Sequence, residues 1–116
     1  MARFHVYINT EGGGYLLDVQ ANLLDQLNTC VVVPLLPLDT APTPAKVLNP
    51  TFEINGAPCL MATQFLATVP RRLMGNEVLN LQEDSSSIVD ALDCLFQGIG
   101  VLRGESRLRP FEHAAA

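Results

Sequence analysis

Few side chains in this sequence have the types and spacing that catalysis or metal binding requires. Asp90 and Asp93 are three residues apart, about one turn of a helix, and such a carboxylate pair could serve acid–base catalysis or bind a cation. A solvated helix face explains the same pair, and we adopt that interpretation. His5 and His113 lie near opposite ends of the chain, and neither has metal-ligand spacing around it. The sequence therefore predicts no catalytic residues, no metal site and no cofactor.

The three cysteines, Cys30, Cys59 and Cys94, lie inside apolar runs. Their number is odd, and they form neither a C-x-x-C motif nor a cysteine–histidine pattern. Cys94 lies among Leu92, Leu95 and Phe96 and has no local base that could activate it. We expect all three to be reduced, packed thiols, as in a protein of the cytoplasm.

The composition predicts a single domain that pairs with a second chain. A length of 116 residues with 48% apolar residues suits one hydrophobic core. Only 16% of the residues are charged, which suggests that part of the surface is covered in a dimer. The formal net charge of −5 opposes direct binding of nucleic acid. We find no signal-peptide core and no apolar run near the roughly 18 residues of a membrane span, so we expect no membrane contact.

Short strands are expected along most of the chain. Residues 3–9 alternate with period two, which places the even-numbered side chains on a buried face and the odd-numbered ones, including His5 and Tyr7, on an outward face. The glycine-rich residues 11–14 form a turn, and 15–20 return as the second strand of a hairpin. These glycines lack the following lysine and helix of a phosphate loop.

The middle of the chain predicts a buried strand, a long loop and a second hairpin. Residues 29–35 are rich in β-branched side chains, and we expect Pro34 to end that strand. Five prolines between positions 34 and 50 predict an exposed loop. The Asn55-Gly56 pair is typical of a two-residue hairpin turn between residues 51–54 and 57–63.

The last third predicts a weak strand, a turn and a helix. Residues 64–69 have a weaker strand pattern, and 74–77 have the composition of a turn before the short apolar piece 78–81. After residue 84 the apolar side chains recur every three or four positions, which indicates an amphipathic helix with a serine as N-cap and Gly98 at its end. We expect residues 100–116 to be a C-terminal extension, and its final three alanines are typical of residues added for expression.

Several short motifs resemble the CcdB family of toxins. The first half contains DVQ at 18–20, LLD at 23–25 and VVVPL at 31–35. The second half contains MAT at 61–63, ATVP at 67–70 and GNEV at 75–78, in the order and at the spacing of that family. The run ALDCLFQGI at 91–99 resembles its ending. The resemblance covers residues 3–99, so we take residues 1–99 as one CcdB-like toxin domain.

The resemblance implies a fold and a mode of action. The fold is mostly β, an SH3-like barrel or two antiparallel sheets with a C-terminal α-helix, assembled as a twofold homodimer. The activity is that of the toxin of a type II toxin–antitoxin system, which binds the A subunit of DNA gyrase and traps gyrase on cleaved DNA without catalysing a reaction. A cognate CcdA-like antitoxin neutralises such a toxin with a C-terminal segment that orders on binding.

The family's target contact lies at the end of the terminal helix, which reads aromatic-Trp-Gly-Ile. Here Gln97 replaces the tryptophan, and the chain continues beyond Ile99 instead of ending there. The resemblance assigns the target-binding role to Leu23, Leu24, Asp93, Phe96, Gln97, Gly98 and Ile99.

Two other functions fit the same scaffold. A toxin-like protein that lost or changed its target would chiefly bind its antitoxin. An endoribonuclease is a further alternative because the related MazF toxins share the barrel, although the acidic body opposes RNA binding. A structural role for the helix end is also open, since Phe96 and Ile99 could close the helix against the core.

Overall fold

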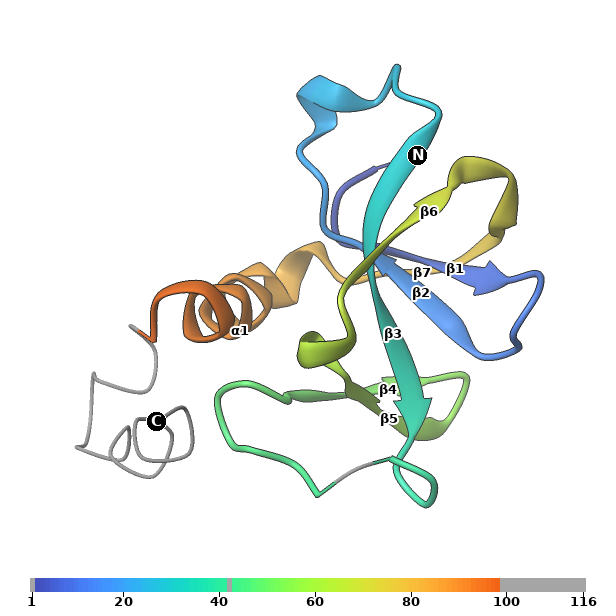
Figure 1. Ribbon diagram of the computed structural model, residues 1–116. Helices are drawn as coiled ribbons and strands as arrows, with labels where there is room; N and C mark the ends of the chain where they lie inside the picture. Colours follow the sequence, from blue (N-terminus) through green and yellow to red (C-terminus); the bar gives the residue numbers. More distant parts are fainter. Residues whose placement is uncertain (1, 42, 99–116) are drawn as a thin grey trace.

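The computed structural model describes residues 2–41 and 43–98, and the C-terminal extension expected at 100–116 lies outside them. Its strands are β1 (His5–Asn9), β2 (Tyr15–Asp18), β3 (Thr29–Pro37), β4 (Thr51–Ile54), β5 (Ala57–Met61), β6 (Ala67–Pro70) and β7 (Met74–Asn80). Four short 3-10 helices, η1 (Asn22–Leu24), η2 (Thr63–Phe65), η3 (Arg71–Leu73) and η4 (Gln82–Asp84), join them, and the helix α1 (Ser85–Gln97) follows (Figure 1).

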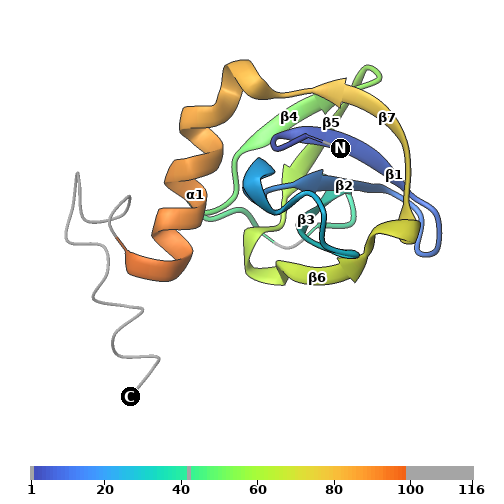
Figure 2. The same ribbon diagram turned by 90° about the horizontal axis from the view of Figure 1, so that it is seen from above.

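All seven strands form one antiparallel sheet in the order β4-β5-β3-β2-β1-β7, with β6 added beside β3. The sheet curls into a half-barrel, and α1 lies along one side of it (Figure 2). The main core includes Val6, Leu17 and Val33 from the sheet and Ile88 and Ala91 from α1. The mostly β fold with one C-terminal helix is confirmed. Within the described residues, no helix is long and apolar enough to cross a membrane.

Both expected hairpins are present. In the first, Val6 pairs with Leu17, which places β1 and β2 on either side of the glycine turn. In the second, Asn55 has φ 53° and Gly56 has φ 83°, as a type I′ turn requires at both central residues. Local sequence signals alone were sufficient for these two elements.

The expected faces of β1 are wrong for two side chains. Tyr7, predicted to point outward, is buried in a second apolar cluster with Leu16, Cys30 and Met74. Ile8, predicted to point inward, is exposed at 39%. Because the sheet curls, both faces of β1 are covered near its middle, and period-two alternation cannot distinguish them there.

The strand β3 passes through Pro34 instead of ending there. Its carboxyl half pairs with β5, at Leu35 and Met61, and its amino half pairs with β6, at Val32 and Ala67. The carbonyl of Pro34 accepts a hydrogen bond from the Ala62 N–H at 3.0 Å, in the gap between those two partners. Since the missing N–H would face this gap, the proline removes no bond from the regular ladder.

Residues 74–77, predicted to be a turn, form the start of β7. β7 pairs with β1 with two register shifts. A Cβ on Gly75 would lie 3.1 Å from the carbonyl oxygen of Ile8 and 3.0 Å from the Thr10 methyl carbon. The glycine therefore permits a close approach of two strands here, which is the second common role of glycine beside turns.

The helix α1 differs from its prediction at the start and agrees at the end. The N-cap is Asp84 and not the predicted serine, and the Asp84 side chain makes no capping hydrogen bond. Gly98 has φ 72°, and its N–H donates to the carbonyls of Asp93 at 2.9 Å and Cys94 at 3.1 Å. This left-handed glycine ends the helix as expected.

The loop between β3 and β4 is anchored by one buried side chain, Asn49. Its Nδ2 donates to the carbonyl of Met61 at 2.9 Å and to Oε1 of Gln64 at 2.7 Å, and its Oδ1 accepts the Ala45 N–H at 3.0 Å. Only half of the described residues between positions 38 and 50 are exposed, so the predicted exposure holds in part. The loop is tied to β5 at its end.

We expect Asn49→Ala to lower the free energy of unfolding by about 2 to 3 kcal/mol, because it leaves buried hydrogen-bonding groups without partners. Chemical denaturation measures the change. Asn76→Ala, at an exposed position on β7, is the control and should cost less than about 0.5 kcal/mol. Equal losses in the two variants would contradict an anchoring role for Asn49.

Candidate functional site

The end of α1 presents a large apolar side chain to solvent. Only Ile88 and Ala91 of the helix are fully buried. At about 100° per residue, Phe96 lies about 140° around the helix from Ala91, away from the face that packs on the sheet. Phe96 is 67% exposed. The alternative in which Phe96 closes the helix against the core is therefore wrong.

The other predicted residues of this helix end have mixed exposure. Gln97 is exposed, whereas Asp93 and Gly98 are partly buried. Ile99 lies outside the described residues. The αL cap at Gly98 fixes the last turn of the helix, so the direction of Phe96 and Gln97 is set by the backbone rather than by contacts of their own.

A second apolar feature lies in residues 21–28 between β2 and β3, which we call the leucine loop. Leu23 is 89% exposed, Leu24 is 44% exposed and Leu27 is 49% exposed. We singled out the first two from the sequence and missed Leu27. The signal that could have indicated Leu27 is the spacing of the three leucines within a polar loop. This spacing has neither the period of a strand nor that of a long helix, so it does not predict burial of all three side chains.

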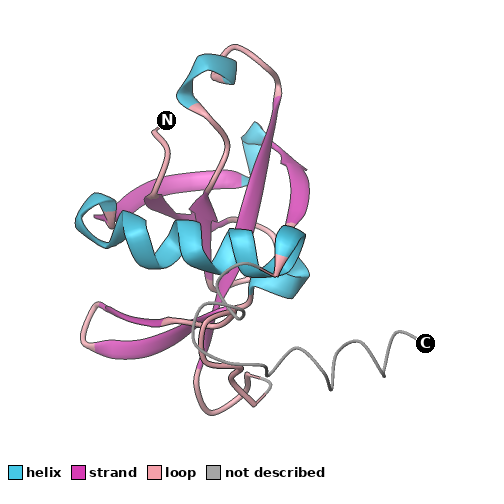
Figure 3. Ribbon diagram, turned by 90° about the vertical axis from the view of Figure 1, so that its left-hand side faces the viewer, coloured by secondary structure: helices cyan, strands magenta, loops and turns pink. Residues whose placement is uncertain are grey.

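The structure does not bring these two features together within one chain. The leucine loop projects from one end of the molecule, whereas α1 lies across the side of the sheet (Figures 1 and 3). The predicted site residues therefore form two separate surfaces, one from Leu23 and Leu24 and one from Asp93, Phe96, Gln97 and Gly98. A single partner could contact both only by spanning that end and side, or by contacting two copies of the chain.

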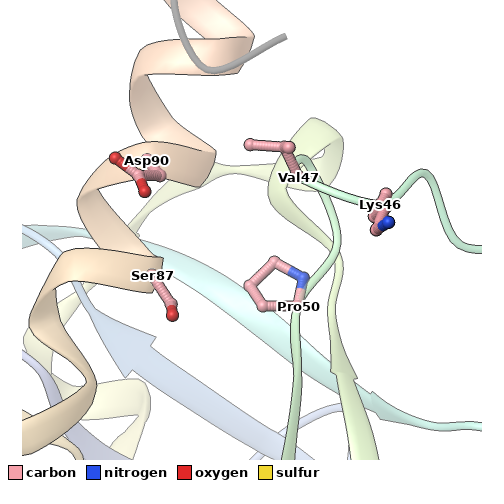
Figure 4. Close-up of a pocket in the computed structure, with 5 residues that line it drawn as sticks. All are labelled: Lys46, Val47, Pro50, Ser87 and Asp90. Carbon is pink, nitrogen blue, oxygen red and sulfur yellow. The ribbon is translucent and has the colours of Figure 1, made fainter. Parts of the chain in front are cut away.

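A shallow hollow of about 190 Å³ lies between α1 and the loop that follows β3. Lys46, Val47 and Pro50 form one side of it, and Ser87 and Asp90 form the other (Figure 4). Among the described residues that line it, Asp90 and Lys46 are the ionisable ones. Across residues 2–41 and 43–98, no three His, Cys, Asp or Glu side chains are grouped to hold a metal ion.

His5 lies beside a carboxylate but does not form a catalytic group. Its Nδ1 is 2.9 Å from Oε1 of Glu77 on the adjacent strand, without hydrogen-bond alignment. No nucleophile is hydrogen-bonded to His5 in the described structure, and a partly exposed pair of this kind contributes little to stability.

The buried thiols are held in the unreactive, protonated form. Burial, and then the adjacent Asp18 carboxylate, raise the pKa of the Cys30 thiol to about 12. Burial also raises the pKa of Cys59, Cys94 and Tyr7. Because the thiolate is the nucleophile, these cysteines serve packing, as the sequence predicted for them.

Comparison with known proteins gives one family and several similar folds. A family model described as CcdB protein matches residues 3–98. The toxin MazF-mt6 of Mycobacterium tuberculosis has a similar structure, with a TM-score of 0.67 and 13% identity over 79% of this chain and 95% of that one. An endoribonuclease from a mycobacterial species, solved with its cognate antitoxin, has a TM-score of 0.64 and 14% identity over 90% and 98%. At such identities the two structures establish a shared fold.

We expect Cys30 to make stability depend on pH in the alkaline range. The folded state retains the thiol proton up to about pH 12, whereas the ordinary thiol pKa is 9.0. This contribution is fully present below pH 9 and is lost as the pH rises toward 12. In that interval, the unfolding free energy of the wild type should fall more steeply than that of Cys30→Ala, by up to about 1.4 kcal/mol per pH unit.

Urea titrations at a series of pH values measure how the unfolding free energy of each protein depends on pH. Comparing these slopes removes the constant free-energy cost of the cavity that Cys30→Ala leaves. Cys94→Ala is the control, since Cys94 is only partly buried and a smaller change in slope is expected. Parallel curves for the wild type and Cys30→Ala would contradict the raised pKa.

Proposed function

Because the chain belongs to the CcdB protein family, we propose that it is the toxin of a toxin–antitoxin pair and that its target is the A subunit of DNA gyrase. The observation that carries this proposal is the helix end, where Phe96 is 67% exposed and Gly98 caps the helix. Most of that aromatic side chain is left uncovered by the fold. It is available as an anchor for a partner, and such anchors often contribute 2 kcal/mol or more to binding.

The proposed target surface consists of the helix end and the leucine loop. Phe96 and Leu23 supply apolar area, and Gln97 offers a hydrogen-bonding amide where the family has a tryptophan. Binding, not catalysis, is the proposed activity. Burial keeps the Cys30 thiol protonated near neutral pH, so this cysteine is not offered as a nucleophile.

The proposed second partner is a CcdA-like antitoxin whose C-terminal segment orders on the toxin. One protein of similar fold was solved with its cognate antitoxin. On this chain we place the antitoxin near residues 34–50 and the Gly12–Gly14 turn. Within residues 34–50, Val47 and Pro50 give the hollow beside α1 an apolar lining. The acidic body, with 4 basic and 10 acidic residues up to position 99, favours a basic segment.

Endoribonuclease activity is the second candidate, because two proteins of similar fold are described as a MazF toxin and an endoribonuclease. The charges of the described residues do not favour it. The Arg3 guanidinium lies over the Phe4 ring at 4.5 Å, and the Arg71 guanidinium donates to backbone carbonyls, so both cations already have partners other than phosphate. A protein that has lost its target and binds only an antitoxin is the third candidate.

We propose a twofold homodimer, because seven large apolar side chains are exposed in the described residues and only 16% of the sequence is charged. Light scattering at micromolar concentration should give about twice the chain mass of 12.6 kDa. A mass of one chain would contradict the dimer.

We expect Gln97→Trp to increase the trapping of cleaved DNA by purified gyrase and Phe96→Ala to reduce it, each by about tenfold or more. The αL cap holds residue 97 in place, so a tryptophan would project from the same point and add stacking area. Asn76→Trp, exposed on β7 and remote from the helix end in sequence, is the matched control and should change nothing.

Three outcomes separate the candidate functions. Trapping by the wild type or by Gln97→Trp, together with rescue of cells that carry a resistant gyrase, supports gyrase poisoning. Killing that persists in the resistant host, with cleaved cellular RNA, supports an endoribonuclease. If neither host is killed and Gln97→Trp does not trap cleaved DNA, the proposal that this helix end binds gyrase is wrong.

A further inference from the structure

The leucine loop has a defined conformation although no side chain of residues 21–28 is buried. Within it, the N–H of Leu24 donates to Ala21 at 2.9 Å, that of Asp25 to Asn22 at 3.1 Å and that of Leu27 to Leu24 at 3.1 Å. Successive turns of this kind are weak in water without a packed face. The anchors of this loop must therefore be polar.

Arg71 supplies three of these anchors from outside the loop. Its backbone N–H donates to the Asn28 carbonyl at 2.9 Å. Its guanidinium donates through Nε to the Leu27 carbonyl at 2.6 Å and through Nη2 to the Leu24 carbonyl at 3.4 Å. One side chain thus joins two carbonyls that lie three residues apart in the loop.

The sheet holds Arg71 in the position that this requires. Arg71 begins η3 directly after β6, whose last residue, Pro70, pairs with Thr29 at the start of β3. The leucine loop ends at that same start of β3. The pairing of β6 with β3 therefore places the guanidinium beside the loop. Figure 1 shows the end of β6 and the loop at the same end of the molecule.

Two further residues secure the other side of the loop. Nε2 of Gln20 donates to the carbonyls of Leu24 and Thr29, both at 3.2 Å. The N–H of Arg3 donates to Oδ1 of Asn22 at 2.8 Å. The carbonyl of Leu24 is the point at which the anchors from Gln20 and Arg71 meet.

We infer that Arg71 is a positioning residue that holds the leucine loop in the conformation that presents Leu23 and Leu24 to the target. Hydrogen bonds from a charged donor are stronger than those between neutral groups, and a loop that is already ordered loses less entropy on binding. The inference rests on the proposed function for the identity of the target, gyrase, but the ordering of the loop is independent of it.

The first experiment measures amide hydrogen exchange of residues 22–27 in the full chain. In Arg71→Ala we expect exchange about tenfold faster than in the wild type, because the Leu27 carbonyl loses its guanidinium donor and the Leu24 carbonyl loses one of its donors. Arg72→Ala removes the same charge from the adjacent, exposed position and should leave the rates unchanged. Arg71→Lys should give intermediate rates, since an ammonium keeps the charge but lacks the planar fork. Equal rates in the Arg71→Ala and Arg72→Ala variants would overturn the inference.

The second experiment measures binding of the same variants to purified gyrase A subunit, with thermal unfolding recorded in parallel. We expect Arg71→Ala to weaken gyrase binding by about tenfold and Arg71→Lys to restore part of it. The thermal unfolding midpoints of Arg71→Ala and Arg72→Ala should be equal. Faster loop exchange with unchanged gyrase binding would overturn the link between the loop and the target.

Leu23→Ala separates failure of this inference from failure of the proposed function. If Leu23→Ala weakens gyrase binding and Arg71→Ala does not, the positioning role is wrong and the target surface stands. If the wild type does not bind gyrase at all, the proposed target is wrong, and the exchange rates alone then uphold or overturn the role of Arg71 in ordering the loop.

Discussion

The division of β3 between two partners on one edge determines the positions of the other elements. β2 pairs along one edge of β3, while β5 and β6 share the other. Between those two strands the chain leaves the sheet at η2, which contacts both β3 and α1. The same division brings β6, and Arg71 after it, to the start of β3 beside the leucine loop. A strand shared in this way must bend, and the bend closes the sheet around the core that α1 completes.

The two proposed target surfaces are held in place by different interactions. The helix end is rigid because the αL glycine and the buried Ile88 and Ala91 fix the backbone. The leucine loop contributes nothing to the core and depends on polar anchors from three separate segments. Exposed apolar area costs about 25 cal/mol per Å² relative to burial, so neither surface is explained by folding alone. The partner that we propose would cover both.

The activity that we propose for this chain is recognition of a partner. Two of its buried ionisable groups, Cys30 and Tyr7, have raised pKa values and remain neutral near pH 7. Selection of a partner then depends on the direction of a few apolar side chains. The helix cap and the hydrogen bonds to the loop carbonyls set that direction. The same curled sheet can carry different functions on its surface, so the fold shared with an endoribonuclease does not by itself assign that activity to this chain.

The sequence by itself determined the elements whose causes are local. The Asn55-Gly56 hairpin and the glycine stop at Gly98 each depend on residues adjacent in the chain. Tertiary structure decided the rest. Pro34 stays within β3 because two distant strands leave a gap at its missing N–H, and Gly75 belongs to a strand because β1 approaches it. The role of Arg71 depends on carbonyls more than 40 residues away in sequence, at a separation of 44 for Leu27. No local pattern encodes a partner at that distance, since the sheet pairing that brings the groups together forms only when the whole chain folds.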